Sequence, residues 1–401
     1  MKYIIAIGDG MGDFPIESLG ERTPLEFTPT PHLDRLAQQG MVGRVATVPE
    51  GMPPGSDVAI MSLLGYNPKG VLTGRGPLEA LALGIKLAES DLAFRLNLVT
   101  MDWNSGTVIR NHAAGDISND EAGVLIQALS QRMPLSGGQA IYQGISYRHV
   151  FVWPDAPGGL PSIAPHDHLD KSIDFFLNDQ AAAPLSHLVK ASWPILADHP
   201  INAKRLAKGL PPANSIWLWG QGRLPVVKTY AERWGLRGAT VSAVDIIRGL
   251  GLATGLEPKR VAGATGGLET NYGGKVEAAI EALKDADLVV VHLEAPDETS
   301  HQGNLDHKIQ AIRNFDQLIV GPLTEKLDAA AVSYRILVAC DHYTPIRLKT
   351  HTADPVPFLI YDSTAPGLSG AAGYSEVACA RGPLIGNGPA LAKLLFGPEK
   401  S

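Results

Sequence analysis

Short apolar runs that end in glycine, aspartate or histidine are the sequence feature that most constrains the fold of this chain. The first run, Tyr3–Ile7, is followed by Gly8 and Asp9, which is typical of a buried parallel strand. A helical pattern follows over Thr30–Gly40. Later strand, helix, strand and strand patterns cover Asp287–Leu293, Lys308–Leu327, Arg335–Ala339 and Val356–Tyr361. This alternation predicts an α/β fold with a doubly wound sheet and helices on both faces.

The middle of the chain has a different pattern of predicted strands and helices. Strand patterns occur there over Phe94–Val99, Thr107–Ile109 and Arg148–Trp153, and one helical pattern near Glu121–Arg132. This predicts a smaller α+β domain at residues 91–178, inserted between two parts of a larger domain at residues 1–90 and 179–401. The apolar run Ile216–Trp219 is expected to belong to the main sheet again.

Polar residues that follow the strand patterns are the candidate metal ligands, because ligands of open α/β sheets bind beyond the carboxyl ends of the strands. Asp9, Asp297, His301, Asp341 and His342 follow such runs, and His351 sits in the loop before Val356. Each alone has an ordinary explanation as a solvated loop or turn residue. Their convergence at separate strand ends favours a metal site. Carboxylates mixed with imidazoles suit Mn²⁺, Zn²⁺ or Mg²⁺.

Ser56 is the candidate nucleophile. It lies in the segment Pro53–Val58, before an apolar helical pattern that includes Ile60 and Leu63. Serine is a leading helix N-cap residue, so a purely structural role is the first explanation. The catalytic alternative is a serine that attacks a phosphate held at the positive end of the helix. The Gly-x-Ser-x-Gly motif of α/β-hydrolases is absent, because positions 54 and 58 are Pro and Val.

Basic residues are the candidate anion ligands: Arg75, Arg95, Arg110, Arg148, Arg260 and Lys275. Arg75 stands between two glycines, which gives its guanidinium room to reach a phosphate. Lys275 is expected in a turn before a helix. The glycine-rich segments do not match a nucleotide cradle: Gly8–Asp13 ends in an aspartate where a pyrophosphate would approach, and Gly263–Gly267 lacks the lysine of a P-loop. Phosphate chemistry is therefore expected to depend on metals and a serine, without a nucleotide.

Composition limits the classes of protein that fit. The chain has 401 residues, a formal net charge of −7 and two cysteines. The charge and the lack of basic blocks argue against a nucleic-acid binder, and no apolar run reaches the ~18 residues of a membrane span. The two cysteines allow one disulfide at most, which favours a reducing compartment. A cytoplasmic enzyme with no nucleic-acid or membrane partner is expected, and the sequence carries no signal for an oligomeric state.

Taken together, these residues resemble the alkaline phosphatase superfamily and, within it, the archaeal-type cofactor-independent phosphoglycerate mutases. The resemblance covers nearly the whole chain, and the order and spacing of its motifs make it specific. The motifs are Gly8-Asp9-Gly10, Pro54-Gly55-Ser56-Asp57, Leu64-Gly65-Tyr66, Gly74-Arg75-Gly76-Pro77, Gly263-Ala264-Thr265-Gly266, Asp297-Glu298-x-x-His301, Cys340-Asp341-His342 and Lys349-Thr350-His351-Thr352. The fold that it implies is an alkaline-phosphatase-like core with an inserted substrate-binding domain.

The resemblance also implies two divalent metal ions and no bisphosphoglycerate cofactor. One ion would be held by Asp297, His301 and His351, and the other by Asp9, Asp341, His342 and the Ser56 hydroxyl. Ser56 would take a phosphoryl group from a small phosphorylated metabolite and pass it to a neighbouring hydroxyl, which interconverts 2- and 3-phosphoglycerate. Arg75 and Lys275 are the further catalytic candidates.

One departure from the family pattern concerns the substrate. Archaeal-type mutases carry a basic stretch resembling Asp-Arg-Arg-Ala-Gly-Arg where this chain has Asn111–Asp116. The missing arginines favour a less acidic or amino-bearing acceptor, as in a bacterial branch proposed to act as a homoserine kinase. The alternative function is therefore a homoserine kinase-like phosphotransferase, or a phosphatase on another small metabolite. The substrate-binding candidates are Arg95, Arg110, His112, Arg148 and Arg260.

Overall fold

The computed structural model describes residues 1–104, 106–367 and 370–400, and it divides the chain into two compact units. The first unit comprises Met1–Leu72 and Val226–Ser401, and the second is the continuous segment Thr73–Pro225. The second unit is therefore an insertion into the first.

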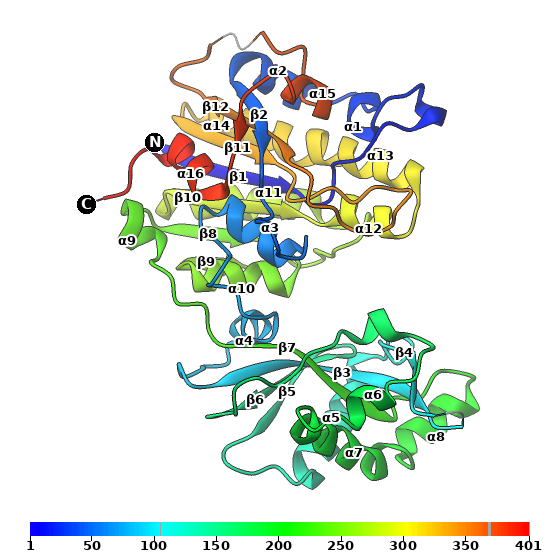
Figure 1. Cartoon of the computed structure of the whole chain (residues 1–401). Helices are drawn as coiled ribbons and strands as arrows, with labels where there is room; N and C mark the ends of the chain where they lie inside the picture. Colours follow the sequence, from blue (N-terminus) through cyan, green and yellow to red (C-terminus); the bar gives the residue numbers. More distant parts are fainter. Residues whose placement is uncertain (105, 368–369, 401) are drawn as a thin grey trace. The chain divides into compact units, whose positions relative to one another are not determined.

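An eight-stranded sheet runs through the first unit (Figure 1), in the order β13-β2-β12-β11-β1-β10-β8-β9. Its strands are β1 (Lys2–Gly8), β2 (Met41–Val45), β8 (Gly238–Val241), β9 (Leu256–Lys259), β10 (Leu288–Leu293), β11 (Tyr334–Ala339), β12 (Val356–Asp362) and β13 (Leu384–Ile385). The strands from β11 to β9 are parallel to one another, whereas β12 pairs antiparallel with both β11 and β2. The predicted doubly wound α/β sheet is confirmed, with β12 as an antiparallel strand.

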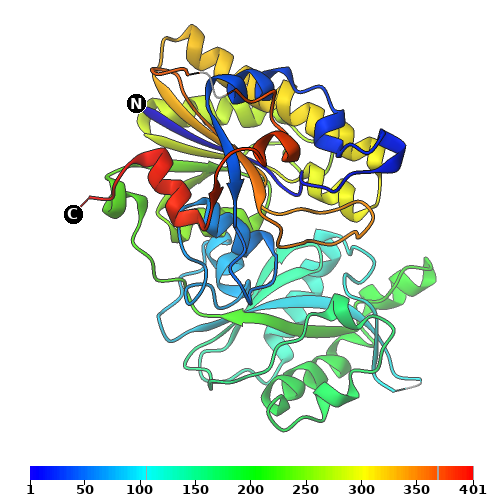
Figure 2. The same ribbon diagram turned by 45° about the horizontal axis from the view of Figure 1, so that its top comes forward.

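Helices cover both faces of this sheet (Figure 2). One layer contains α2, α11, the π-helical turn η3 and α14, and another contains α3, α10 and α16. The helical elements of the unit are η1 (Glu17–Leu19), α1 (Pro24–Phe27), α2 (Pro31–Gln39), α3 (Ser56–Leu63), α9 (Tyr230–Trp234), α10 (Asp245–Ala253), α11 (Tyr272–Asp285), α12 (Ala295–His301), α13 (Leu305–Asn314), η3 (Phe315–Val320), α14 (Gly321–Ala329), α15 (Glu376–Cys379) and α16 (Gly388–Phe396). None of the described helices is long and apolar enough to cross a membrane.

The predicted helix over Lys308–Leu327 is three consecutive helical segments. α13 ends at Asn314, η3 follows, and α14 begins at Gly321. Pro322 has no N–H for the preceding turn, so the regular hydrogen-bond ladder must change register before it. The apolar pattern continues through all three segments, which is why the sequence suggests a single helix.

A five-stranded antiparallel sheet forms the second unit, with β3 pairing with β4, β6 and β7, and β6 pairing with β5. Its elements are α4 (Gly76–Ala82), β3 (Leu92–Asp102), β4 (Val108–Asn111), α5 (Asn119–Arg132), β5 (Ala140–Ile145), β6 (Arg148–Trp153), η2 (Pro165–His168), α6 (Asp174–Leu177), α7 (Ala183–Leu196), α8 (Pro200–Ala207) and β7 (Ser215–Gly222). α5 and α7 pack on this sheet over the larger core of the unit. The predicted α+β character of the insertion is confirmed.

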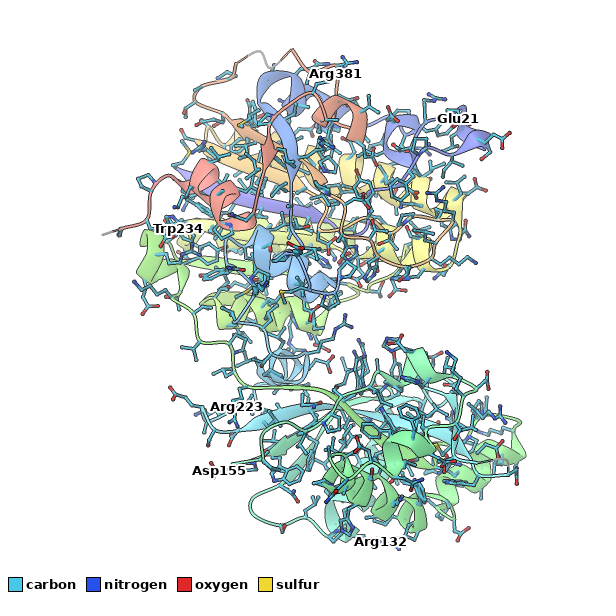
Figure 3. The ribbon with its side chains drawn as sticks, viewed as in Figure 1. Glu21, Arg132, Asp155, Arg223, Trp234 and Arg381 are labelled. Atoms are coloured by element: carbon cyan, nitrogen blue, oxygen red, sulfur yellow. The ribbon has the colours of Figure 1, made fainter. Side chains whose placement is uncertain are left out.

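The inserted unit is wider than the predicted range 91–178. The segment Ile216–Trp219, expected in the main sheet, lies in β7 and pairs with β3, so that expectation is wrong. The two ends of the unit meet: the Thr73 hydroxyl donates to the Arg223 carbonyl at 3.1 Å and accepts from the Arg223 N–H at 2.8 Å (Figure 3 labels Arg223). The boundaries therefore lie at Thr73 and Pro225.

Candidate metal centre and catalytic serine

The carboxyl ends of β1, β10 and β11 bring the candidate metal ligands together. β1 lies between β10 and β11 in the sheet, and all three are parallel, so the residues that follow them meet at one edge. Asp9 directly follows β1, and Asp341 and His342 lie two and three residues after the end of β11. Asp297 is held in α12, which begins two residues after β10 ends. The sequence prediction thus identified residues that share one place in the fold.

The outer ligand group consists of Asp297, His301 and His351. The Nε2 atoms of the two histidines lie 2.8 Å apart. They approach the Asp297 carboxylate at 3.2 Å from His301 and 3.4 Å from His351. The other ring nitrogen of His301 donates to the Lys349 carbonyl at 2.9 Å, which orients Nε2 toward the group. Ligand atoms spaced like this fit around one ion at ~2.0–2.2 Å from each donor.

The inner ligand group consists of Asp9, Asp341, His342 and Ser56, of which all but Ser56 are fully buried. His342 Nε2 lies 3.1 Å from Asp341 Oδ2, 3.6 Å from Asp9 Oδ1 and 3.2 Å from Ser56 Oγ. The Gly10 N–H donates to the second oxygen of Asp341 at 3.1 Å. The imidazole of His342 stacks on that of His351 with ring centroids 3.9 Å apart, so the two groups are adjacent.

Electrostatics at this edge favour a bound cation. Burial and repulsion from Asp341 raise the pKa of Asp9 well above its usual value. Burial also opposes ionisation of Asp297, but the hydrogen bonds from His301 and His351 outweigh it, so the pKa of Asp297 falls well below its usual value. The same hydrogen bond with Asp297 raises the pKa of His301 to about 9. Carboxylates that repel one another in a buried site are stabilised by an added positive ion.

The residues present fit divalent metal ions by a further observation. Within the described part of the chain, no hydrogen-bond donor serves the buried atoms Asp9 Oδ1 and Asp341 Oδ2. Buried carboxylate oxygens are normally hydrogen-bonded or bound to a cation, because an unpaired one costs free energy. Both atoms lie beside His342 Nε2, so the three form the start of a coordination shell.

Ser56 lies at the first residue of α3 rather than at its N-cap, which is Gly55. Its side chain is half-buried, and its Oγ faces His342. α3 is a buried helix, since every residue from Val58 to Leu63 is inaccessible to solvent. The packing of α3 therefore fixes Ser56 beside the inner group, and the hydroxyl does not serve as a helix cap.

Three residues at this edge were missed by the sequence analysis. His292, inside β10, contacts Asp9 Oδ2 through Nε2 at 2.9 Å and Ser242 Oγ through Nδ1 at 3.1 Å. Glu294 directly follows β10, and burial raises its pKa to about 8. Like Asp9, Glu294 is an acidic residue directly after an apolar strand pattern, so the rule that predicted Asp9 also applies to it. His292 is hidden in an apolar run, and no signal in the sequence marks Ser242.

Lys275 lies inside α11 rather than in a turn before it, and it is almost fully buried. Its Nζ donates to the His292 carbonyl at 2.8 Å. Burial lowers its pKa to about 8, against the attraction of Glu294. Lys275 therefore supplies a positive charge beside β10, close to the inner ligand group.

The second unit gathers several of the anion-binding candidates. The guanidinium of Arg95 lies over the Trp219 ring at 5.0 Å and pairs with Glu79 at 3.4 Å. Burial lowers the pKa of Arg95, and the attraction of Glu79 opposes this effect. Two nearby cations, Arg148 and Arg75, lower the pKa further. The remaining candidate here, His112, lies 6.0 Å from His166 and 5.9 Å from Tyr147, measured between ring centroids. His166 and Trp219 were not among the candidates predicted from the sequence, because they are far from the other members of this cluster along the chain.

Two candidates lie away from that cluster. Arg110 is exposed and is held by Asp102 and Asp170 at 3.0 and 2.9 Å. Arg260 is exposed in the first unit, directly after the edge strand β9. The glycines beside Arg75 also have a packing reason: a Cβ at position 74 would lie 2.1 Å from a backbone oxygen of β7, and one at position 76 would lie 2.2 Å from a backbone oxygen of β3.

Comparisons with known proteins agree with this arrangement. Residues 37–202 match the family model described as 2,3-bisphosphoglycerate-independent phosphoglycerate mutase. A probable mutase of this type from Geobacter sulfurreducens is 47% identical over 94% of both chains, and one from Methanosarcina acetivorans is 46% identical over 96% of both.

Solved structures show the same fold. A protein of Pyrococcus horikoshii aligns with a TM-score of 0.84 at 28% identity, covering 98% of this chain and 96% of its own. The cofactor-independent phosphoglycerate mutase of Thermoplasma acidophilum aligns with a TM-score of 0.65 at 27% identity, covering 98% and 99%. The chain belongs to the family of 2,3-bisphosphoglycerate-independent phosphoglycerate mutases.

Proposed function

We propose that this protein interconverts 2- and 3-phosphoglycerate with the help of two divalent metal ions and a phosphoserine at Ser56. The observation that carries the proposal is the position of Ser56 Oγ, 3.2 Å from His342 Nε2 and beside two buried carboxylate oxygens without donors. The naming of the relatives as mutases supports the choice of substrate.

The outer ligand group would hold one ion, and the inner ligand group would hold the other. Bound there, the ions would supply Lewis-acid stabilisation of the phosphoryl charge and lower the pKa of the serine hydroxyl. Their identity among Mn²⁺, Zn²⁺ and Mg²⁺ would follow from availability, because the ligands are carboxylates and imidazoles.

Ser56 carries the covalent chemistry of the proposed reaction. Its Oγ forms a bond to phosphorus while the bond from phosphorus to the substrate oxygen breaks, and that oxygen takes up the proton that Ser56 gives up. The neighbouring hydroxyl of the glycerate then attacks the phosphoserine in the reverse sense. Both steps require Ser56 to keep its place at the start of α3, which the buried helix provides.

An acidic substrate is supported by the second unit. Arg148 and Arg75 lie close enough to Arg95 to lower its pKa, and Glu79 is the acidic group that pairs with Arg95. The departure at Asn111–Asp116 forms a turn in which Asn111 Oδ1 accepts from two backbone N–H groups. Arginines elsewhere in the unit would offer positive charge to an acidic substrate, which supports phosphoglycerate over homoserine.

The test is turnover of 3-phosphoglycerate by protein loaded with Mn²⁺, without bisphosphoglycerate. We expect 2-phosphoglycerate to form with the wild type and not with Ser56→Ala. Ser62→Ala, a buried position on the same helix, is the matched control and should remain active. Substrate labelled with ³²P should label the wild type and Ser62→Ala only. Transfer to homoserine instead of glycerate, or hydrolysis alone, would contradict the mutase assignment.

A further inference from the structure

The hydroxyl of Thr344 contacts both ligand groups. Thr344 follows His342 by two residues and is fully buried. Its Oγ1 lies 2.5 Å from Asp297 Oδ1, in the outer ligand group, and 3.2 Å from His342 Nδ1, in the inner ligand group. The side chain thus spans the boundary between the two groups without belonging to either.

The hydrogen atoms of this contact can be placed from simple donor counting. A threonine hydroxyl has one hydrogen to donate, and an ionised carboxylate can only accept. The Thr344 hydroxyl therefore donates to Asp297 Oδ1 and accepts the hydrogen on His342 Nδ1. A neutral imidazole with its hydrogen on Nδ1 carries its lone pair on Nε2. Nε2 is the His342 atom that faces Ser56 Oγ and Asp341 Oδ2.

We propose that Thr344 is a positioning residue, which links the two ligand groups and fixes the tautomer in which His342 can bind a metal ion through Nε2. The inference rests on the proposed metal-dependent function, because it concerns residues that would hold the ions. Partners of this kind commonly change metal affinity by ~10–100-fold when they are removed.

The surroundings of Thr344 hold it in this place. Its N–H donates to the Gly12 carbonyl at 3.2 Å, and its own carbonyl accepts from Lys308 Nζ at 2.9 Å. Gly10 packs directly against the contact, since a Cβ there would lie 2.6 Å from Thr344 Oγ1 and 2.7 Å from Asp297 Oδ1. Gly10 also has φ +61°, which favours glycine. The hydroxyl is therefore fixed by its backbone contacts and by close packing.

The test is a Mn²⁺ titration of the substrate-free protein, with free Mn²⁺ read from its electron paramagnetic resonance signal. We expect Thr344→Val, which keeps the shape but loses the hydroxyl, to raise the Kd about 10-fold or more. Thr344→Ser should bind within a few-fold of the wild type. Thr324→Val is the control, because Thr324 is equally buried and lies outside both ligand groups. Its hydroxyl donates to the helix carbonyls of Val320 and Gly321 and accepts from Arg35 at 3.4 Å.

Equal affinity of Thr344→Val and the control would overturn the proposal, and so would equal losses in Thr344→Val and Thr344→Ser. Should the valine variant fail to fold, Thr344→Ala compared with Thr344→Ser carries the test, since both lack the methyl group and differ in the hydroxyl. A wild type that binds no Mn²⁺ would also overturn it. Turnover of 3-phosphoglycerate by the wild type then shows separately whether the proposed function stands.

Discussion

Lys308 makes a buried ion pair in the first unit, and its loss should destabilise that unit. Its Nζ is fully buried and donates to Asp13 Oδ2 at 2.9 Å, the Thr344 carbonyl at 2.9 Å and the Gly12 carbonyl at 3.2 Å. Lys308→Met leaves Asp13 buried without its counter-charge and the Thr344 carbonyl without a donor, whereas the Gly12 carbonyl keeps the Thr344 N–H. Breaking a buried pair from one side costs ~3–5 kcal/mol. At ~2–4 °C per kcal/mol for a unit of this size, the Tm should fall by about 6–20 °C.

Thermal unfolding of the metal-free protein, followed by circular dichroism, measures this change. Lys326→Met is the matched control, because its ion pair with Glu277 at 3.0 Å is exposed on both sides and should contribute ~0–1 kcal/mol. The double variant of Lys308→Met and Asp13→Asn should lose less free energy of unfolding than the two single variants together, because Asp13→Asn removes the unpaired charge. A Tm of Lys308→Met no lower than that of the control, or strict additivity, would refute the reasoning.

Three further predictions concern stability and substrate binding. Burial raises the pKa of Glu376 to about 7 from a usual 4.5. The contribution of this group to stability is therefore complete below pH 4.5 and is lost as the pH rises through 7. Glu376→Gln should flatten the dependence of the free energy of unfolding on pH, measured by urea unfolding between about pH 4 and 8. Gly388→Ala should lower the Tm because its Cβ would lie 1.8 Å from a backbone oxygen of α3, whereas Gly386→Ala has open space and should not. Arg110→Ala should leave KM for 3-phosphoglycerate within a few-fold, because two carboxylates already hold that side chain; a tenfold rise would show that it binds substrate.

Most of the candidate metal ligands could be predicted from the sequence because one rule locates them, whereas His351 lies in the loop before β12. Parallel strands end at the same edge, so polar residues after apolar runs converge whatever the loops between them do. Glu294 obeys this rule and was still missed; it lies between β10 and α12, three residues before the candidate Asp297. His292 and Thr344 act through hydrogen bonds to other residues, and such contacts depend on distances across the fold that a linear pattern does not contain.

The inserted unit shows a different limit. The run Ile216–Trp219 has the composition of a central strand, and composition alone does not distinguish one sheet from another. Its partner is β3, more than a hundred residues earlier in the chain, and the pairing is decided by packing in the core of the second unit. For the same reason, the cluster of Arg95, His166 and Trp219 could not be assembled from spacing.

The net charge of −7 and an anionic substrate are compatible once the charges are placed. Exposed charges act over about 8–10 Å at physiological salt, so a phosphate responds to the groups that line its site rather than to the sum over the chain. At the sheet edge, Asp9 and Asp341 repel each other in a buried site, and two divalent ions would bring up to four positive charges there. Lys275 adds a further positive charge beside Glu294. The ligand carboxylates Asp9, Asp297 and Asp341 would offset at most three of those four charges, so the edge with both ions bound would attract phosphate although the chain as a whole is acidic.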